Sequence, residues 1–500
     1  MAPLMELGIA GKPRKTNWDF EPLFHKYNAH FRKSGVTREL AENVANLQYG
    51  DIPSDILGLG KSVLLDALGC ILSGSTQESS RKVLRYVRSQ ECTPEATVAV
   101  YGYKTHAYYA ALLNGAFCHA WAFDDSLGPS LSGEGAVVPV VLASAERNLA
   151  NGHEVLTALV TGLEVICRIA AAAPSVPLRR PLDPVSTFGP WGAAAAVGKI
   201  LRLDADDMEN AFTLTSAQAA ATLQAEETGG EAIRLHAGFA AMHGLRVVQL
   251  ARLGLSGARE ILEGPEGFLM CIAGVNPDGS PKFDATKVNE SFGKDWLLRG
   301  VTLKKYPVES SQLSIIENLA RMRDEKRIRQ EEVEEIQIRT DPISGESLSS
   351  AKLPTANDLH ATQYSMTWGA SMAMTLGKND IASYRDNIPP SGRSAEIAEF
   401  AKKVRILNHK ATERERTPIQ TITIRLKNDT TWSIDAAWPR GNCLHNPMTW
   451  EELEQKFRVQ AQLGGISSTQ QDRIIDITRS LEEQDDVTAL IHNLVRREEQ

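Results

Sequence analysis

Between residues 107 and 221 the chain carries a succession of weakly charged segments that are rich in alanine and leucine and poor in β-branched residues. Alanine and leucine are strong helix formers, so these segments predict helices. Small side chains also allow neighbouring helix axes to approach closely, so the succession predicts a tightly packed helical core. The predicted helices span residues 107–117, 135–149, 154–171, 191–201 and 205–221.

Helical signals begin at Ser34, after a polar segment, residues 1–33, that we interpret as an N-terminal extension. Residues 51–54 (Asp-Ile-Pro-Ser) offer a capped helix start, and leucine and isoleucine then recur at helical spacing until Gly74. The whole first part of the chain, residues 34–299, is therefore predicted to be helical.

The pattern changes near residue 300. Residues 335–340 alternate polar and apolar side chains as a half-buried strand does, and residues 422–426 and 432–434 flank a polar turn like the strands of a hairpin. An apolar stretch of helix length, residues 362–376, lies between them. Helical signals then return with the capping-box sequence Thr-Trp-Glu-Glu at residues 449–452 and continue to residue 495.

These changes predict a mainly α protein with an interrupted helical domain. A large all-helical domain would be formed by both ends of the chain, residues 34–299 and 441–500. A smaller α+β domain, residues 300–440, would be inserted between them. No internal repeat is found in the sequence.

Charge and cysteine spacing argue against several partners and cofactors. The chain has 54 lysines and arginines against 62 aspartates and glutamates, a net charge of −8. Nucleic acids and anionic membranes bind proteins that carry clustered basic residues, so neither is an expected partner. The six cysteines stand singly with no CxxC pair, so neither a zinc knuckle nor an iron–sulfur cluster is predicted. With no signal-peptide core and no apolar run of about 18 residues, we expect a soluble, cytoplasmic protein.

Seven short motifs follow one another between about residue 34 and residue 490. They are Asp51-Ile52-Pro53 with Leu64-Leu65-Asp66-Ala67-Leu68-Gly69, Asn114-Gly115 with His119 and Phe123-Asp124-Asp125, Thr187-Phe188-Gly189 with the Gly-Ala run 192–196, Arg234-Leu235-His236-Ala237-Gly238, Leu262-Glu263-Gly264-Pro265, Lys304-Lys305-Tyr306-Pro307, and Pro439-Arg440-Gly441 with Asn446-Pro447-Met448-Thr449. Each motif is weak alone, but their order is specific. Together they resemble the MmgE/PrpD family, which includes 2-methylcitrate dehydratases and cis-aconitate decarboxylases.

The resemblance implies a fold and a mode of action. Members have a large helical domain made from both chain ends, a smaller inserted α+β lid, and an active site in the cleft between them, usually in a homodimer. They act on small molecules without an organic cofactor. We therefore expect a small-molecule substrate, a homodimer and no cofactor.

The resemblance also implies which positions carry the chemistry. Typical members use an Asp, a Thr and a His around the Asp-Phe-Asp-Asp stretch, a His and a Lys further on, and a Lys and a Tyr in the lid. In this chain four of these residues are replaced, by Ala122, Ser132, Asp183 and Ile233 in place of Asp, His, His and Lys. The others keep related chemistry, with Ser126 in place of Thr, Arg234 next to the lost Lys, and the lid residues Lys304 and Tyr364.

We predict two groups of site residues from these positions. Elimination of water or carbon dioxide needs groups that hold carboxylates, a group that moves a proton and a group that stabilises developing negative charge. The predicted catalytic residues are Asp183, Lys304 and Tyr364, and the predicted substrate-binding residues are Ser126, Ser132, Arg234 and His236.

Each prediction has a structural alternative. Asp183 is either a carboxylate base tuned by burial or the start of a turn with Pro184. Ser126 and Ser132 are either ligand contacts or hydroxyls that cap loop backbone. Tyr364 is either catalytic or a buried phenol within an apolar helix, and His236 either lines the cleft or is a satisfied core histidine.

Two groups of acidic residues also have both a functional and a structural interpretation. Asp124-Asp125 looks like a metal-binding pair, but helix capping or pairing with a cation is commoner, so no metal site is predicted. Glu226-Glu227, together with Glu231, forms an acidic loop that would repel a tricarboxylate if it entered the cleft.

The sequence thus predicts a lyase or isomerase that acts by proton transfer on a small carboxylate or carbonyl compound. Because the acid–base set is reduced, we expect a substrate other than citrate-like acids and a role in a specialised biosynthetic pathway. One alternative is a conventional cis-aconitate decarboxylase or 2-methylcitrate dehydratase. Another is a catalytically silent member that binds a ligand.

Overall fold

The structure is a computed structural model. The predicted N-terminal extension, residues 1–33, and the acidic pair Glu226-Glu227 lie outside the part of the chain that it describes. The described residues are 35–127, 131–174, 181–225, 229–340, 352–408 and 420–497.

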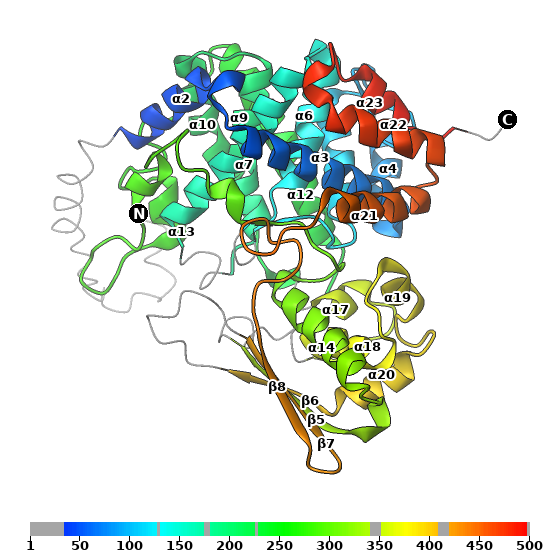
Figure 1. Cartoon of the computed structure of the whole chain (residues 1–500). Helices are drawn as coiled ribbons and strands as arrows, with labels where there is room; N and C mark the ends of the chain where they lie inside the picture. The colour runs from blue at the N-terminus through cyan, green and yellow to red at the C-terminus, as the bar shows by residue number, and fades with distance from the viewer. Residues whose placement is uncertain are drawn as a thin grey trace, which may run out of the picture.

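Helices dominate the described chain, so the prediction of a mainly α protein is confirmed (Figure 1). One large body, in the upper half of Figure 1, consists of helices with only two-residue strands between them. Its helices are α2 (Val36–Asn46), α3 (Ser54–Gly74), α4 (Glu78–Arg88), α5 (Ala107–Cys118), α6 (Glu134–Asn148), α7 (Gly152–Ala172), α9 (Pro184–Ile200), α10 (Ala205–Thr215), α12 (His236–Arg252), α13 (Phe268–Ala273), α21 (Trp450–Leu463), α22 (Ser468–Arg479) and α23 (Thr488–Asn493).

The alanine-rich helices pack closely, as their small side chains predict. A Cβ atom added to Gly115 on α5 would lie 2.7 Å from the Cα atom of Gly238 on α12. A Cβ atom on Gly192 of α9 would lie 2.4 Å from the carbonyl oxygen of Gly162 on α7. Backbone therefore meets backbone at these crossings, and any larger side chain would push the helices apart.

Two of these helices have a boundary more than two residues from its predicted position. Helix α9 begins at Pro184, seven residues before the predicted start, because the side chain of Asp183 accepts a hydrogen bond from the backbone N–H of Ser186 and caps the helix. Proline at the first helical position fits this start. Helix α10 ends at Thr215 instead of residue 221, since a short 3₁₀ turn, Ser216–Gln218, follows it.

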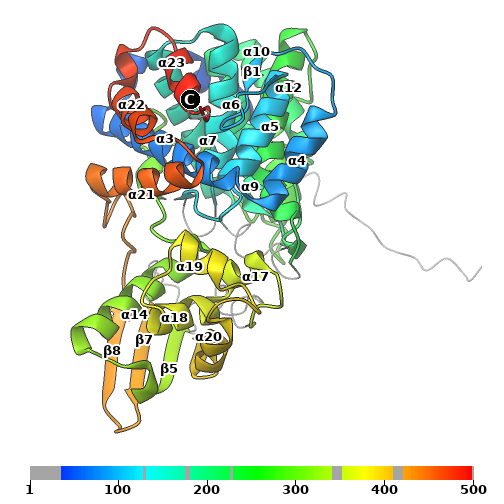
Figure 2. The same cartoon turned by 90° about the vertical axis from the view of Figure 1, so that its right-hand side faces the viewer.

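A second body, in the lower half of Figure 1, combines a four-stranded sheet with helices on one of its faces (Figures 1 and 2). The strand order is β6-β5-β7-β8; β5 pairs with β6 in parallel and with β7 antiparallel, and β7 and β8 form the predicted hairpin. The elements are α14 (Leu313–Lys326), β5 (Val333–Thr340), α17 (Leu359–Tyr364), α18 (Met366–Thr375), α19 (Ile381–Asp386), α20 (Ser394–Ala401), β6 (Val404–Asn408), β7 (Gln420–Leu426) and β8 (Thr431–Ala436).

The apolar stretch 362–376 is not one helix, as the sequence suggests, but the end of α17 followed by α18. Ser365 separates them: its backbone is extended, with φ −87° and ψ 108°, and its side chain accepts a hydrogen bond from the N–H of Trp368. A serine in this conformation caps the following helix. Tyr364 therefore stands at the end of a short helix and not within a long one.

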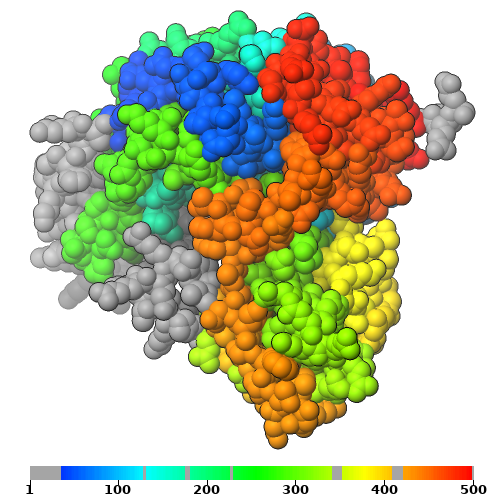
Figure 3. Space-filling model, in the orientation of Figure 1, coloured from blue at the N-terminus to red at the C-terminus, as the bar shows by residue number. Residues whose placement is uncertain are grey.

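Each body has its own hydrophobic core. The larger core takes buried side chains from both ends of the chain, for example Leu40 and Val63 with Phe457 and Leu490. The smaller core runs from Val308 to Ala436. The segment after β8, orange in Figures 1 and 3, leads from the sheet back to α21 on the helical body. Thr449 and Glu452 form the predicted capping box at the start of this helix.

Two helices, α3 and α7, are long and apolar enough to cross a membrane by length and composition. The expectation that no apolar stretch reaches this length is therefore wrong. In α3 the apolar window is 72% buried inside the protein, and in α7 it is 89% buried. Their apolar surface is covered by neighbouring helices of the same chain, which is the environment of core helices.

Candidate active site

Five of the seven predicted site residues lie in or contact one turn, residues 119–126, which follows α5. The other two, Asp183 and His236, contact each other. The turn leads into strand β3 (Ser126–Leu127), which pairs with β4 (Val301–Thr302) just before Lys304. Ser126 Oγ also lies 2.9 Å from Ser310 Oγ and accepts its hydrogen bond. The turn thus joins the helical body to the start of the α+β body.

His119 and Asp124 form a buried pair within this turn. Nδ1 of His119 lies 2.7 Å from Oδ2 of Asp124, and both side chains are almost fully buried. Ser132 donates to the same carboxylate oxygen at 2.5 Å and to Oδ1 of Asp125 at 2.8 Å. The hydroxyl of Ser132, predicted to bind substrate, therefore holds the two adjacent carboxylates in place.

Asp124 and Asp125 differ in charge although they are neighbours. Burial opposes ionisation of Asp124, but its interactions with His119, Lys304 and Ser132 outweigh burial and hold its pKa well below the ordinary value. Burial and the charge of Asp124 together raise the pKa of Asp125 to about 7. One carboxylate is thus firmly ionised and the other titrates near neutral pH.

Lys304 reaches the same turn from the other side. Its Nζ donates a 3.2 Å hydrogen bond to the carbonyl oxygen of Ala122 and lies 3.9 Å from Oδ1 of Asp124. The neighbouring Lys305 is exposed and points to Glu317, 3.3 Å away. Of these two lysines, Lys304 is the one placed at the site.

Arg234 connects the two bodies. Its guanidinium donates to the carbonyl oxygen of His119 at 3.3 Å and to Oε1 of Gln363 at 2.8 Å. Gln363 in turn donates to the carbonyl oxygens of Trp121 and Pro307. Arg234, which follows the position where Ile233 replaces the family lysine, therefore has structural partners. Its role in substrate binding stays a prediction.

Asp183 and His236 face each other, although 53 residues separate them in the sequence. Oδ1 of Asp183 lies 3.1 Å from Nδ1 of His236, close enough for an ion pair but poorly aligned for a hydrogen bond. Burial opposes ionisation of Asp183, but His236 and the N–H of Ser186 outweigh it and lower its pKa. Asp183 is thus both the cap of α9 and the carboxylate partner of an imidazole.

Tyr364 packs against the two positions where apolar residues stand in place of family Asp and Lys. Ala122, Ile233 and Tyr364 form a small apolar cluster that is separate from both large cores. The ring of Tyr364 also lies 4.0 Å from that of His360. The predicted catalytic tyrosine therefore joins a buried apolar cluster next to Lys304.

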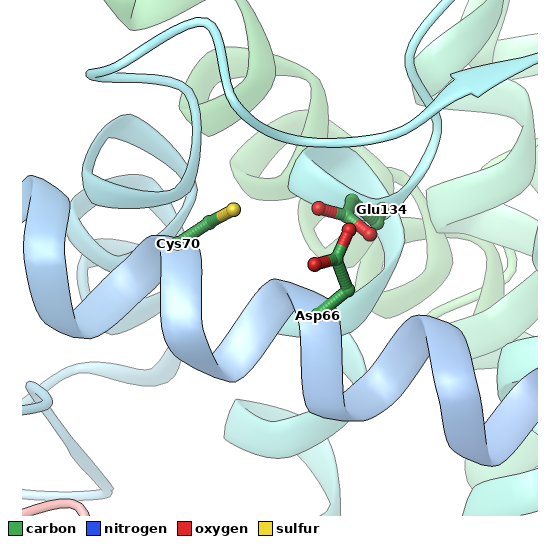
Figure 4. A group of neighbouring side chains, drawn as sticks. All are labelled: Asp66, Cys70 and Glu134. Carbon is green, nitrogen blue, oxygen red and sulfur yellow. The ribbon is translucent and has the colours of Figure 1, made fainter. Parts of the chain in front are cut away.

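Behind the turn lies a buried charged cluster that the sequence did not lead us to predict. Figure 4 shows Asp66 and Cys70 on α3 turned toward Glu134 at the start of α6. One ligand atom of each lies within 4.8 Å of the others, as a metal site would require. Nζ of Lys456 lies 2.6 Å from Oδ1 of Asp66 and supplies the positive charge there.

This cluster is closed off from solvent. Burial and the charge of Asp66 raise the pKa of Glu134 well above its ordinary value. Lys456 also donates to the carbonyl oxygen of Phe123, so the cluster supports the turn from behind. A lone Asp66 within an apolar helix was the sequence signal that could have pointed to it.

Glu231 of the acidic loop makes its contact at the surface. Its carboxylate pairs with the exposed Lys82 at a distance of 2.7 Å. Glu231 therefore gives no support to a repulsive acidic loop inside the site.

Comparison with known proteins assigns the chain to a family. The MmgE/PrpD N-terminal domain matches residues 38–279, and the MmgE/PrpD C-terminal domain matches residues 306–483. The chain belongs to the MmgE/PrpD family. The resemblance of the seven sequence motifs is thereby confirmed.

Relatives of this MmgE/PrpD protein carry decarboxylase names. Cis-aconitate decarboxylase of Mus musculus is 26% identical over 475 residues, which cover 91% of this chain and 92% of the relative. Cis-aconitate decarboxylase of Aspergillus terreus is 26% identical over 486 residues, or 92% and 96% of the two chains. The cis-aconitate decarboxylase-like protein oryM of Aspergillus oryzae is 31% identical over 304 residues, or 58% and 62%.

Proposed function

We propose that this protein is an MmgE/PrpD-type lyase that removes carbon dioxide or water from a small carboxylic acid by moving a proton next to a carboxylate. The observation that carries the proposal is the pair formed by Asp183 and His236. A carboxylate stands where typical members have a histidine, and it faces an imidazole 3.1 Å away. Histidine is the commonest acid–base group near neutral pH. The pair supplies the function that the lost histidines would otherwise perform.

The other groups fit distinct tasks in the same reaction. Lys304, beside the carbonyl of Ala122, would bind a substrate carboxylate and stabilise negative charge as it develops. In a β,γ-unsaturated acid, the bond to the leaving carboxylate breaks and its electron pair forms a new double bond. The electrons of the old double bond take up a proton at the far carbon, which the imidazole of His236 would deliver. The products are carbon dioxide and the rearranged acid, so no cofactor is needed.

Proton transfer without loss of carbon dioxide or water is the isomerase form of the same proposal. Removing and returning the proton on opposite faces of one carbon would give an epimer. Lys304 would stabilise the intermediate carbanion in either case. By analogy with other folds that serve several metabolic functions, we also propose that the protein acts in a specialised biosynthetic pathway. We propose a cytoplasmic location as well.

A catalytically silent, ligand-binding protein is the second candidate. The contacts of Ser132 with Asp124 and Asp125 favour it, because a hydroxyl that binds two carboxylates stabilises the fold without any reaction. A conventional cis-aconitate decarboxylase is the remaining alternative. It is supported by the names of the relatives rather than by the replaced residues.

We also propose a homodimer that buries an exposed apolar surface on the helical body. Tyr86, Phe239, Leu250 and Leu253 are 52%, 47%, 41% and 85% exposed. They line one surface hollow of about 540 Å³ with residues of α4, α5 and α12. A contiguous apolar patch of this kind is typical of protein–protein contact.

A panel of substrates tests the proposed reaction. Purified protein would be incubated with unsaturated and hydroxylated di- and tricarboxylic acids, and the products identified by mass spectrometry. We expect turnover of at least one acid, and a large loss of kcat in the variants Asp183→Asn and His236→Gln. Lys305→Ala is the matched control and should keep its activity. Specific thermal stabilisation by one acid with no turnover of any would support the silent alternative instead.

A further inference from the structure

The apolar cluster of Ala122, Ile233 and Tyr364 lies where a charged site would be expected. It draws on three separate segments: the turn after α5, the 3₁₀ turn Ala232–Leu235, and the end of α17. Ala122 and Ile233 are each 1% exposed and Tyr364 is 7% exposed. The cluster belongs to neither large core and takes side chains from both bodies, so it forms a buried apolar contact between them.

The backbone at Ala122 does not favour alanine. Its φ angle is +50°, in the left-handed region where asparagine and aspartate are enriched several-fold over other non-glycine residues. An aspartate would thus suit the backbone better than the alanine that is present. The small apolar side chain is therefore explained by what surrounds it, which is Ile233 and Tyr364, and not by the turn itself.

The cations beside the cluster are already in contact with protein groups. Lys304 contacts the carbonyl oxygen of Ala122 and lies near the ionised Asp124. Arg234 follows Ile233 but points to His119 and Gln363. A buried carboxylate is costly unless a partner neutralises it. These two cations are therefore poorly suited to neutralise all three carboxylates of a tricarboxylate.

Any ligand of Lys304 would lie next to the cluster, because Lys304 contacts Ala122. The ammonium group lies 3.2 Å from the backbone of Ala122, so a carboxylate held by Lys304 has its carbon chain within a few ångströms of the cluster. We propose that the substrate is an acid with at most two carboxylates that presents an alkyl substituent to Ala122, Ile233 and Tyr364. This inference rests on the proposed lyase function and narrows its substrate class.

A graded series of acids isolates the contribution of the apolar cluster. Glutaconate, 3-methylglutaconate and 3-propylglutaconate share the unit HOOC–CH₂–C(R)=CH–COOH, and in cis-aconitate R is a carboxylate. Loss of carbon dioxide from each breaks the C–C bond to the CH₂-linked carboxylate. The freed pair forms CH₂=C(R), and the CH carbon gains a proton. The reacting atoms are therefore the same throughout, and only the group that faces the cluster changes.

In the native protein we expect kcat/KM to rise about fourfold for each methylene transferred from water to the cluster. The value for 3-propylglutaconate should exceed that for cis-aconitate at least tenfold. In the variant Ile233→Lys we expect the preference to move at least tenfold toward cis-aconitate, because a cation now faces R. Ile233→Met, of similar length and uncharged, is the matched control and should keep the alkyl preference.

A thermal unfolding scan of each variant checks that it is folded. If Ile233→Lys does not fold, Ala122→Asp and Ala122→Asn form a second matched pair, since both suit a φ angle of +50°. In that pair only the charged variant should lose the alkyl preference. Equal changes in the charged and uncharged variants would overturn the inference.

Ligand binding, measured as the rise in unfolding temperature with each acid, separates this inference from the proposed function. Turnover of cis-aconitate with equal or lower turnover of the alkyl acids would overturn the inference and leave the lyase function standing. Stabilisation that grows with alkyl length, with no turnover of any acid, would overturn the lyase function and support the role of the apolar cluster. Neither turnover nor stabilisation would overturn both.

Discussion

The titration of Asp125 gives a prediction whose size follows from the structure. Its Oδ1 accepts hydrogen bonds from Ser132 Oγ and from the N–H groups of Gly133 and Glu134. Its Oδ2 is buried with no hydrogen-bond partner among the described residues. An asparagine keeps the accepting oxygen and replaces Oδ2 by an uncharged NH₂ group, so Asp125→Asn reproduces the protonated acid.

The sign of the effect follows from the raised pKa. The pKa of Asp125 is about 7 in the folded protein against an ordinary value of 3.8. The folded protein therefore holds the proton in a range where the unfolded chain has released it. Stability from this group is fully present below the unfolded pKa and is lost as the pH rises through about 7. At about 1.36 kcal/mol per pH unit, the loss amounts to about 4 kcal/mol at most.

Thermal unfolding scans between pH 4 and pH 8.5 measure this loss. We expect Asp125→Asn to unfold near the temperature of the native protein at pH 4 and roughly 4 °C above it at pH 8.5, at about 1 °C per kcal/mol for a chain of 500 residues. Asp124→Asn is the control with the opposite sign. Asp124 is ionised beside His119 and Lys304, so its neutral variant should lose stability at pH 8.5.

One result would refute this reasoning. If Asp125→Asn lowered the unfolding temperature equally at both pH values, the carboxylate would be ionised throughout and its charge would be needed. A raised temperature in Asp124→Asn at pH 8.5 would likewise show that the two charges had been assigned in the wrong order.

Three further predictions concern activity, packing and assembly. Lys304→Met should reduce kcat/KM on the order of a hundredfold, whereas Lys305→Met, whose ammonium points to a surface glutamate, should change it little; comparable losses in both would contradict the placement of Lys304. Gly115→Ala should lower the free energy of unfolding by about 1–3 kcal/mol in denaturant titrations, because its Cβ would lie 2.7 Å from backbone of α12. Gly58→Ala, with nothing within 4 Å of the added Cβ, should raise that free energy by up to about 1 kcal/mol, and a loss there would point to a general intolerance of helix substitution. Leu253→Glu should reduce the mass measured by light scattering from that of two chains to that of one, and an unchanged mass would rule out the exposed surface as the contact.

Local sequence signals located most elements of this fold but not all of their ends. Helix α5 and the hairpin of β7 and β8 match their predicted spans closely, because periodicity and turn residues are properties of neighbouring positions. Asp183 and Ser365 mark two of the exceptions. Each is a capping residue whose side chain contacts an N–H group three positions on, and this decided where α9 and α18 begin.

The candidate site was only partly predictable. Lys304 could be found from its motif, and the replacement of family residues by Ala122 and Ile233 could be read from the sequence. The sequence could not show that these two residues contact each other and Tyr364, because more than 100 residues separate Ala122 from Ile233 and from Tyr364. The same holds for Asp66 and Lys456, which form an ion pair across 390 positions.

The sequence by itself determined that this chain is a mainly helical MmgE/PrpD protein with most of the usual acid–base residues replaced. Composition, periodicity and the order of motifs are properties of the linear sequence, so they can be recognised without the structure. Only the tertiary structure decided what the replacements make together: an imidazole beside Asp183, and a buried apolar cluster beside Lys304. The physical reason is that charge, burial and pKa depend on neighbours in space, which folding brings together from distant parts of the chain.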